Sequence, residues 1–190
     1  IHKAGLNTVR IFVPYLDFGK AKVELDKLNK LEEILNIAEK TNLKVIITLF
    51  DFYGNYDIKD WTLNFKHAKT IVEKFKNHIA ILAWDLKENV IAWLSNLSDV
   101  VKNIDKKNLI TIGWSNANDA IILQNKVDFI SFHFYNSAKE FEDSYNQLIN
   151  NVNNKAIVLE EFGKSSYRGI WNAFGSSEEA QANYFKEMQK

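Results

Sequence analysis

The sequence of 190 residues contains no cysteine, one proline and only seven glycines. Without cysteine the chain can form neither a disulfide nor a thiolate metal site. Lys plus Arg and Asp plus Glu balance at 24 each, so net charge gives no general attraction to nucleic acid or to an anionic membrane. No apolar run reaches the roughly 18 residues of a membrane span, and Ile1–Gly5 does not resemble a signal peptide. We expect a soluble protein, and these features do not choose between secretion and the cytoplasm.

Apolar and aromatic residues are abundant by contrast. Hydrophobic residues make up 46% of the chain and aromatic residues 13%, which fills one core but not two ordinary domains. We therefore expect residues 1–190 to form a single domain. Most aromatic side chains should fill its core, and a few would be free to act as flat platforms in a sugar-binding groove.

Apolar runs of strand length recur along the chain, and segments with helical spacing lie between them. Their nearly continuous hydrophobicity is typical of parallel strands that are covered on both faces. The expected strands are Asn7–Pro14, Leu43–Phe50, Ile79–Leu86, Leu109–Trp114, Val127–Phe134 and Lys155–Phe162.

Three segments carry apolar residues three and four positions apart, which predicts amphipathic helices that face a core. Ser137 with Glu140 resembles a capping box at the start of the third helix, and residues 176–179 open a last helix in the same way. The three apolar stripes are Leu25, Leu28, Leu31, Leu35 and Ala38; Val90, Trp93, Leu94, Leu97, Val101 and Ile104; and Phe141, Tyr145, Leu148 and Val152.

The repetition of strand and helix predicts an α/β fold with a parallel sheet, either closed as a barrel or open and doubly wound. An open nucleotide-binding sheet would carry a GxGxxG or Walker A motif, and neither occurs. Polar and aromatic residues gather instead at the carboxyl ends of the strands, where barrel enzymes assemble their active sites. This favours a (β/α)₈ TIM barrel. The residues are Arg10, Tyr15, Asp51, Asp85, Lys87, Trp114, His133, Tyr135, Glu160 and Glu161.

The expected barrel is incomplete. A TIM barrel typically needs about 250 residues and eight strands, whereas the pattern gives about six strand–helix units. The first and last strands are the ones that the pattern lacks. We therefore expect the sequence to be part of a longer protein.

Two carboxylates end the last expected strand, where Lys155–Leu159 is followed by Glu160 and Glu161. Charge at the rim of a buried strand is costly unless a cation or a function compensates it. Alternation along a strand places the two side chains on opposite faces, so only one should face the barrel interior. The structural alternative is a solvated glutamate or a surface pair with lysine, and it applies more to Glu160 than to Glu161.

Arg10 lies inside the apolar run Val9–Val13, where a guanidinium needs a carboxylate nearby. Glu161 from another strand is the candidate partner. Such a pair would keep the carboxylate ionised at neutral pH, as a nucleophile requires. The alternative is an ion pair that only stabilises the barrel.

His133 and Tyr135 stand two residues apart at a strand end and share a face. Either can hydrogen-bond a sugar hydroxyl or the nucleophile, and a purely structural histidine is the alternative. Trp61 and Trp171 follow strands in polar segments, so each is either a stacking platform for a sugar ring or a packing residue between helix and barrel. The remaining histidines show no metal-ligand spacing, and we expect no metal and no cofactor.

Four segments resemble successive strands of clan A glycoside hydrolases, most closely the family 5 cellulases and β-mannanases. The resemblance implies a TIM barrel that binds carbohydrate, with Glu161 as the catalytic nucleophile and Arg10 as the arginine that supports it. It places His133 and Tyr135 in the substrate wall. The segments cover nearly the whole chain in the order of the family, and they are Ala4–Ile11, Leu43–Asp51, Ile81–Lys87 and Leu159–Gly163.

The resemblance fails after the third of our expected strands. Family members continue there as Trp-Asp-Leu-Lys-Asn-Glu-Pro, whose Glu is the general acid/base, but here Lys87 is followed by Glu88, Asn89 and Val90. Three explanations compete: Glu88 acts from a shifted position, the protein is catalytically inactive, or a loop is absent between Lys87 and Glu88. We favour the third, because a loop of about two residues is shorter than a functional βα loop usually is.

The leading hypothesis is a retaining glycoside hydrolase that cleaves β-mannan or β-glucan with two carboxyl groups about 5 to 5.5 Å apart. The alternative is a catalytically inactive carbohydrate-binding or structural TIM-barrel relative or fragment. A Schiff-base enzyme that uses Lys87 ranks lower, because Asp85 on the same face favours the charged ammonium over the neutral amine.

Overall fold

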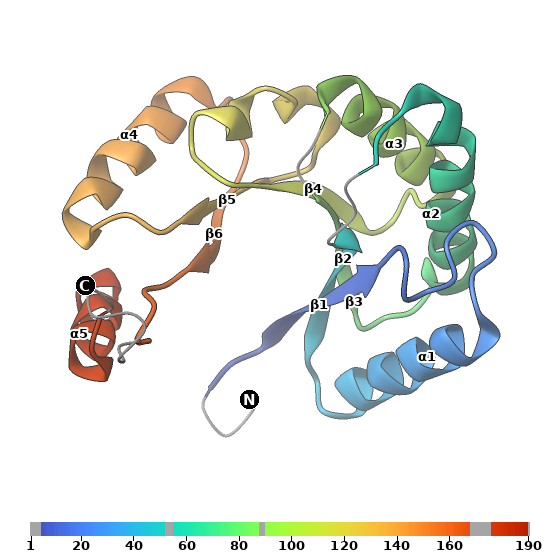
Figure 1. Cartoon of the computed structure of the whole chain (residues 1–190), viewed down its shortest axis with the longest axis horizontal. Coiled ribbons are helices and arrows are strands. Elements are labelled where there is room, and N and C mark those ends of the chain that lie inside the picture. Colours follow the sequence, from blue (N-terminus) through green and yellow to red (C-terminus); the bar gives the residue numbers. More distant parts are fainter. Residues whose placement is uncertain (1–4, 52–54, 88–89, 168–175, 190) are drawn as a thin grey trace. The chain divides into compact units, whose positions relative to one another are not determined.

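A computed structural model describes residues 5–51, 55–87, 90–167 and 176–189. Its strands are hydrogen-bonded in the order β1-β2-β3-β4-β5-β6 (Figure 1). Neighbours in sequence are thus neighbours in space, whereas a doubly wound sheet reverses its order at a switch point. This singly wound order, with helices between parallel strands, confirms the prediction of an incomplete (β/α)₈ barrel.

The chain divides into two compact units. The first unit comprises Ile1–Ile112 and Asn125–Phe129, and the second comprises Gly113–Gln124 and Ile130–Lys190. The strand β4 contributes residues to both. Each unit is described by itself below.

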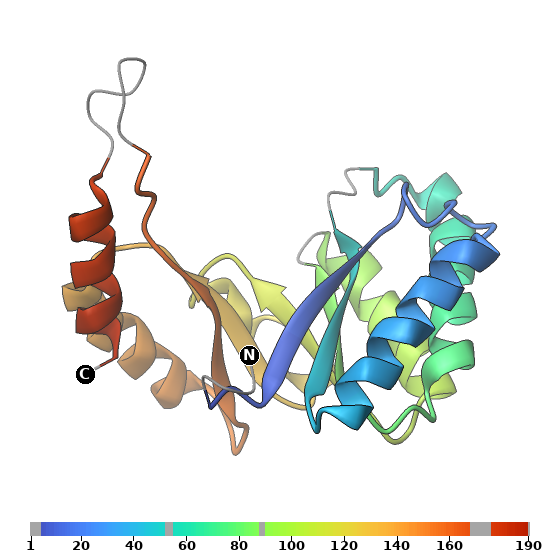
Figure 2. The same cartoon turned by 90° about the horizontal axis from the view of Figure 1, so that it is seen from below.

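The first unit builds three parallel strands with a helix after each. Val9 pairs with Val45 across β1 and β2, and Ile47 pairs with Trp84 across β2 and β3. The three helices lie on the same side of these strands (Figure 2). The elements are β1 (Thr8–Pro14), α1 (Leu25–Lys40), β2 (Lys44–Asp51), η2 (Ile58–Asp60), α2 (Trp61–Phe75), β3 (Ile81–Lys87), α3 (Ile91–Ile104) and the first part of β4 (Leu109–Trp114).

The apolar stripes of α1 and α3 form much of the core of this unit. The stripe of α1 is buried except at Leu25, which is 68% exposed. Val90, which precedes α3, is 48% exposed. Leu25 is the first residue of α1 and Val90 directly precedes α3. At these positions a residue can match the helical spacing of the apolar stripe and still not pack against the sheet. The two are therefore not core residues.

The second unit contains the last two strands and two helices. Ser137 and Glu140 form the expected capping box, and the Ser177 hydroxyl accepts a hydrogen bond from the Ala180 amide at 3.1 Å. The fifth strand begins at Ile130, three residues later than the sequence predicts, because residues 127–129 form an irregular, bent segment after η4 (Gln124–Lys126). The elements are η3 (Asp119–Ile121), β5 (Ile130–Phe134), η5 (Ala138–Glu140), α4 (Phe141–Asn151), β6 (Ile157–Phe162) and α5 (Glu178–Met188).

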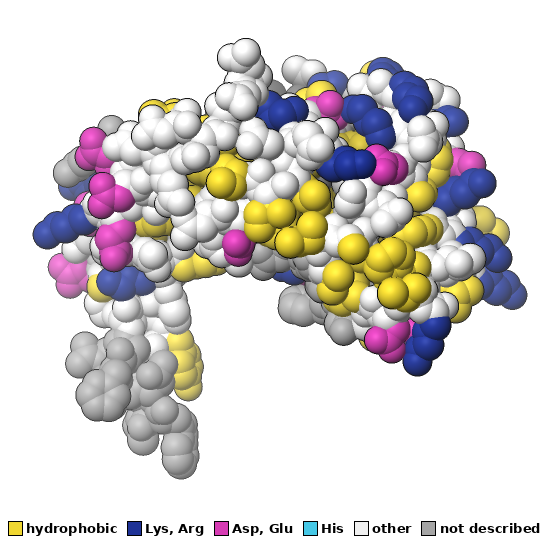
Figure 3. Space-filling view, turned by 90° about the horizontal axis from the view of Figure 1, so that it is seen from above, with side chains coloured by type: hydrophobic (Ala, Val, Ile, Leu, Met, Phe, Trp, Pro, Cys, Tyr) yellow, Lys and Arg dark blue, Asp and Glu magenta, His cyan; other side chains and the backbone are white. Residues whose placement is uncertain are grey.

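Charged side chains of both signs are interspersed on the face drawn in Figure 3, in keeping with their equal numbers in the sequence. Within the described ranges, no helix has both the length and the apolarity needed to cross a bilayer.

Asp105 anchors the buried end of the first unit. Its carboxylate accepts hydrogen bonds from Trp84 Nε1 at 2.8 Å and from the backbone amides of Lys107 and Asn108. Burial alone would raise the pKa of Asp105, but these hydrogen bonds outweigh it and hold the pKa below its usual value. The charged carboxylate thus ties β3 to the turn that leads into β4.

His67 on α2 is fully buried against Tyr15 and Phe50. Its Nδ1 atom lies 2.6 Å from the backbone oxygen of Lys20, an arrangement that a neutral ring with a proton on Nδ1 satisfies. Burial lowers the pKa of His67 to about 4, and the hydrogen bond offsets this only in part. His67 therefore serves the core.

This burial makes stability depend on pH. In the unfolded state His67 binds a proton below about pH 6.5, whereas in the folded state it does so only near pH 4. The free energy of unfolding should therefore decrease as the pH is lowered from 6.5 to 4, by up to about 3 kcal/mol. Denaturant unfolding at pH 7, 6, 5 and 4 measures the slope. His67→Gln should flatten it, whereas Lys66→Gln, an exposed neighbour on the same helix, should not. An unchanged slope in His67→Gln would contradict the assignment.

Candidate functional site

Arg10, Thr48 and Asp85 join the three strands of the first unit through their side chains. Arg10 Nε donates to Thr48 Oγ1 at 2.8 Å, and Arg10 Nη2 donates to Asp85 Oδ2 at 2.6 Å. Thr48 Oγ1 donates to the same carboxylate oxygen at 2.6 Å. The Arg10 side chain is 11% exposed and that of Asp85 is fully buried. The structure thus places a charged, buried cluster across β1, β2 and β3.

The carboxylate that Arg10 was expected to need is therefore present, and it comes from Asp85 on β3. Glu161, the partner predicted from the sequence, belongs to the second unit, and its pairing with Arg10 stays a prediction. The sequence identified Asp85 as a polar strand end but not as a partner of Arg10. Its position between the apolar residues Trp84 and Leu86 was the available signal.

Glu161 and Tyr135 meet at the carboxyl ends of β6 and β5. The Tyr135 hydroxyl donates to Glu161 Oε2 at 2.5 Å, as expected of a hydrogen bond to a carboxylate. The Glu161 side chain is 30% exposed and Tyr135 is 59% exposed, so solvent reaches both. A carboxylate that is oriented by a phenol and open to solvent is suited to act on a bound molecule.

His133 lies beside both glutamates. Its Nε2 atom is 3.6 Å from Glu161 Oε1 and 3.6 Å from Glu160 Oε2. The side chains of His133 and Glu160 are only 5% and 3% exposed. The second unit therefore brings together His133, Tyr135 and Glu161, three of the residues predicted from the sequence.

A β-bulge explains why both glutamates reach one imidazole. Phe132 pairs with Leu159, but the next residue, His133, pairs with Glu161, so Glu160 is the extra residue of the bulge. A bulge interrupts the alternation of side chains along its strand. The expectation that Glu160 and Glu161 point to opposite faces is therefore wrong.

A polar pocket of about 350 Å³ adjoins His133 and Tyr135 within the second unit. It is lined by residues that directly follow β4, by the carboxyl end of β5 and the two residues after it, and by two residues of α4. The side-chain amide of Gln147 donates to Asn118 Oδ1, and Asn116 is held by two hydrogen bonds with Asp119. The lining residues are Ser115, Asn116, Ala117, Asn118, His133, Phe134, Tyr135, Asn136, Ser144 and Gln147.

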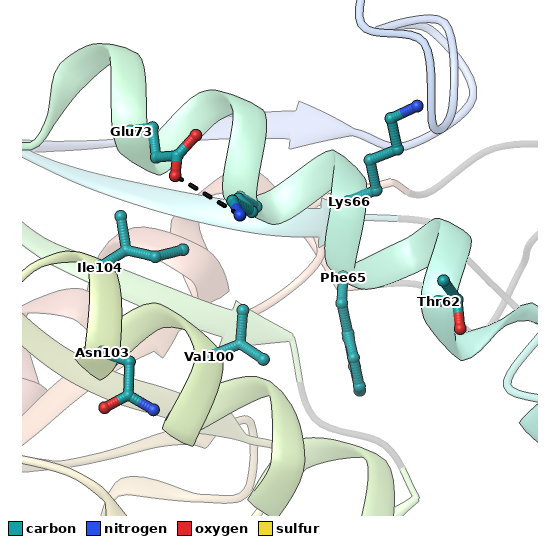
Figure 4. A pocket seen from close by; sticks show the side chains of 8 residues that line it. Thr62, Phe65, Lys66, Glu73, Val100, Asn103 and Ile104 are labelled. Atoms are coloured by element: carbon teal, nitrogen blue, oxygen red, sulfur yellow. Dashed lines mark ion pairs between the residues drawn. The ribbon is translucent and has the colours of Figure 1, made fainter.

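A larger hollow of about 500 Å³ lies between α2 and α3 in the first unit. Phe65 of α2 and Val100 and Ile104 of α3 line it, and an ion pair of 3.8 Å joins Lys69 to Glu73 of α2 (Figure 4). This hollow lies between two helices and not at the carboxyl ends of strands, where barrel active sites form. We therefore place the candidate site at Glu161.

The two tryptophans predicted as sugar platforms have different outcomes. Trp61 begins α2, where its Nε1 donates to the Tyr56 carbonyl at 2.8 Å, and its half-buried ring lies beside Phe65. Its role in substrate binding stays a prediction. Trp171 lies outside the described residues, as do Glu88 and Asn89.

Few features of the sequence predict the pocket. Asn116 and Asn118 belong to a polar stretch after the fourth strand, which was a usable signal, but Gln147 follows no pattern that marks it. No group of three or more His, Asp or Glu side chains suited to a metal ion occurs in the part of the chain that the structure describes.

The buried cluster of Arg10 should be essential for stability. Asp85→Ala leaves a guanidinium buried without its carboxylate, and we expect it to lower the free energy of unfolding by about 3–5 kcal/mol. Asp99→Ala is the matched control, because Asp99 pairs with Lys126 at 2.8 Å while 56% exposed; it should cost less than about 1 kcal/mol. Equal losses in denaturant unfolding of the two variants would contradict the role of the cluster.

Comparison with known proteins gives a match over the whole chain. Residues 1–190 match the family model described as Cellulase (glycosyl hydrolase family 5). Mannan endo-1,4-beta-mannosidase A of Emericella nidulans is 24% identical over 161 residues, which cover 62% of this chain and 42% of that protein. The chain thus spans less than half the length of this relative. The matched stretch is 161 residues long, but it includes only 62% of the 190 residues of this chain. The relative therefore carries residues inside the matched stretch that this chain lacks.

Solved structures share the fold. An endoglucanase of Pseudomonas stutzeri superposes with a TM-score of 0.71 at 16% identity, covering 87% of this chain and 66% of the endoglucanase. A GH113 beta-1,4-mannanase gives a TM-score of 0.67 at 16% identity and covers 96% of this chain and 71% of the mannanase. At such identities the likeness shows the barrel fold alone. The match of the family model over residues 1–190 shows that the chain belongs to glycosyl hydrolase family 5, a family of glycoside hydrolases.

Proposed function

We propose that residues 1–190 form one partial catalytic domain of a retaining hydrolase that cleaves β-linked glycans of the mannan or glucan type. The observation that carries this proposal is the carboxylate of Glu161, which receives the Tyr135 hydroxyl at 2.5 Å at the carboxyl end of β6. Membership of glycosyl hydrolase family 5 and the similarity to a fungal mannosidase support the substrate class.

In this mechanism Glu161 attacks the anomeric carbon and forms a covalent glycosyl-enzyme, which water then hydrolyses. The hydrogen bond from Tyr135 restricts the rotation of the carboxylate. His133 lines the same site and offers a hydrogen-bonding group to the sugar. Arg10, held by Thr48 and Asp85, is the further substrate-site residue of this proposal, and Trp61 and Trp171 are its sugar platforms.

A second carboxylic acid must protonate the departing oxygen and then activate water. We propose that this acid belongs to a loop after β3, which is absent from the sequence between Lys87 and Glu88. The extra residues of the fungal relative inside its matched stretch support this view. A reaction that needs no acid therefore tests the nucleophile by itself.

Glycosides with a 2,4-dinitrophenyl leaving group provide such a reaction, since this phenolate departs without protonation. The full-length protein should release dinitrophenolate from the β-mannobioside or the β-cellobioside. We expect Glu161→Gln to lower kcat/KM by at least about 10³-fold, because the nucleophile is lost. Glu142→Gln, an exposed residue in the first turn of α4, is the control and should keep wild-type activity. Near-wild-type turnover by Glu161→Gln would end the proposal.

The same assay tests the alternative of an inactive carbohydrate-binding relative, which the lack of Asn-Glu-Pro after Lys87 favours. Binding of oligosaccharides in calorimetry without any release of dinitrophenolate by the wild-type protein would establish that alternative.

Tyr135 should act as a positioning residue for Glu161. Tyr135→Phe removes one hydrogen bond to a charged group, and because Tyr135 is exposed and water partly replaces it, we expect kcat/KM to fall roughly tenfold. The loss should lie in kcat, with little change in KM, since the bond stabilises the reacting carboxylate. Tyr145→Phe on α4 is the control. A change confined to KM would assign Tyr135 to substrate binding alone.

A further inference from the structure

Glu160 is a buried, charged side chain beside the candidate site, and the proposed mechanism gives it no role. It is the extra residue of the bulge in β6, and its side chain is only 3% exposed. Alternation along a regular strand would have turned Glu160 away from Glu161. The bulge keeps a second carboxylate next to the reacting one, although burial of a carboxylate is costly unless its surroundings compensate it.

His133 lies midway between the two glutamates. Its Nε2 atom is 3.6 Å from Glu160 Oε2 and 3.6 Å from Glu161 Oε1. Both distances are longer than the roughly 2.7 to 3.2 Å of an N–H···O hydrogen bond, so a movement of less than about 1 Å would join His133 to either glutamate. In the part of the chain that the structure describes, His133 Nε2 makes no hydrogen bond and is buried.

The surroundings of Nε2 determine which ring nitrogen carries the proton. An ionised carboxylate only accepts hydrogen bonds, and an imidazole nitrogen without a proton also only accepts. An unprotonated Nε2 would therefore direct its lone pair toward two acceptors. We expect Nε2 to carry a proton, and a buried N–H without a close acceptor costs free energy until it finds one.

The proposed reaction changes the two acceptors that Nε2 faces. One oxygen of Glu161 forms a bond to the anomeric carbon while the bond from that carbon to the leaving oxygen breaks, and the electron pair of the broken bond leaves with that oxygen. Glu161 thereby changes from a charged carboxylate to a neutral ester, which is a weaker acceptor. Glu160 takes no part in these bond changes and becomes the stronger acceptor of the two.

We propose that Glu160 is a positioning residue that acts through His133, by accepting a hydrogen bond from Nε2 as Glu161 loses its charge. The assignment rests on the proposed function. The hydrogen bond from His133 to Glu160 is absent at rest and forms as the reaction proceeds. An interaction that is stronger in the transition state than in the ground state accelerates the chemical step without strengthening the binding of substrate.

First-turnover kinetics of the full-length protein with the 2,4-dinitrophenyl glycosides test this role. Glu160→Leu removes the acceptor and should lower the rate of dinitrophenolate release at saturating substrate at least about tenfold. The half-saturating concentration should stay within about twofold. Glu160→Gln keeps an acceptor oxygen in its amide, so its rate should lie within about threefold of wild type. Glu142→Gln, exposed on α4, is the control and should keep the wild-type rate.

Nitrogen-15 NMR of the His133 ring tests the proposal without any change at Glu160. The signals are assigned by their loss in His133→Gln. At rest Nε2 should carry a proton. A 2,4-dinitrophenyl 2-deoxy-2-fluoroglycoside traps the glycosyl-enzyme, and the Nε2 proton signal should then move downfield because the hydrogen bond to Glu160 has formed.

A wild-type rate in Glu160→Leu with wild-type circular dichroism would overturn the proposal, and so would a Glu160→Gln variant as slow as Glu160→Leu. If Glu160→Leu does not fold, the NMR experiment decides: an Nε2 without a proton at rest, or an unchanged signal after trapping, would equally overturn it. A failure of the hydrolase proposal is distinct, since the unsubstituted protein would then release no dinitrophenolate.

Discussion

Parallel pairing of consecutive strands brings chemically active side chains together in each unit. Because β1, β2 and β3 are parallel and paired side by side, residues far apart in the sequence meet at neighbouring positions of the sheet. Arg10, Thr48 and Asp85 meet in this way in the first unit. The pairing of β5 with β6 does the same for His133 and Glu161 in the second.

The two units manage buried charge differently. In the first, the guanidinium of Arg10 and the carboxylate of Asp85 satisfy each other and a threonine hydroxyl, which is the arrangement that makes burial of an ion pair tolerable. In the second, Glu161 stays partly open to solvent and takes its oriented hydrogen bond from an exposed tyrosine. The first arrangement suits a scaffold, and the second leaves a carboxylate available for reaction.

The position of a hollow in the barrel, and not its volume, identifies the candidate site in this protein. The larger hollow lies between α2 and α3, while the smaller one lies at the strand ends beside His133 and Tyr135. In a barrel the side chains at the carboxyl ends of the strands converge on one site, and a hollow between two outer helices lies away from those ends.

The sequence by itself determined the six strands, the helices between them and the barrel class, and it identified Arg10, His133, Tyr135 and Glu161 as candidate site residues. These follow from local hydrophobic spacing and from residues at the ends of apolar runs, which are properties of contiguous segments. Only the tertiary structure gave Arg10 its partner Asp85, turned Glu160 and Glu161 toward one histidine, and formed a pocket from α4 and two strand ends. Partners across strands depend on register, and a single extra residue in β6 shifts that register in a way that alternation along one strand cannot reveal.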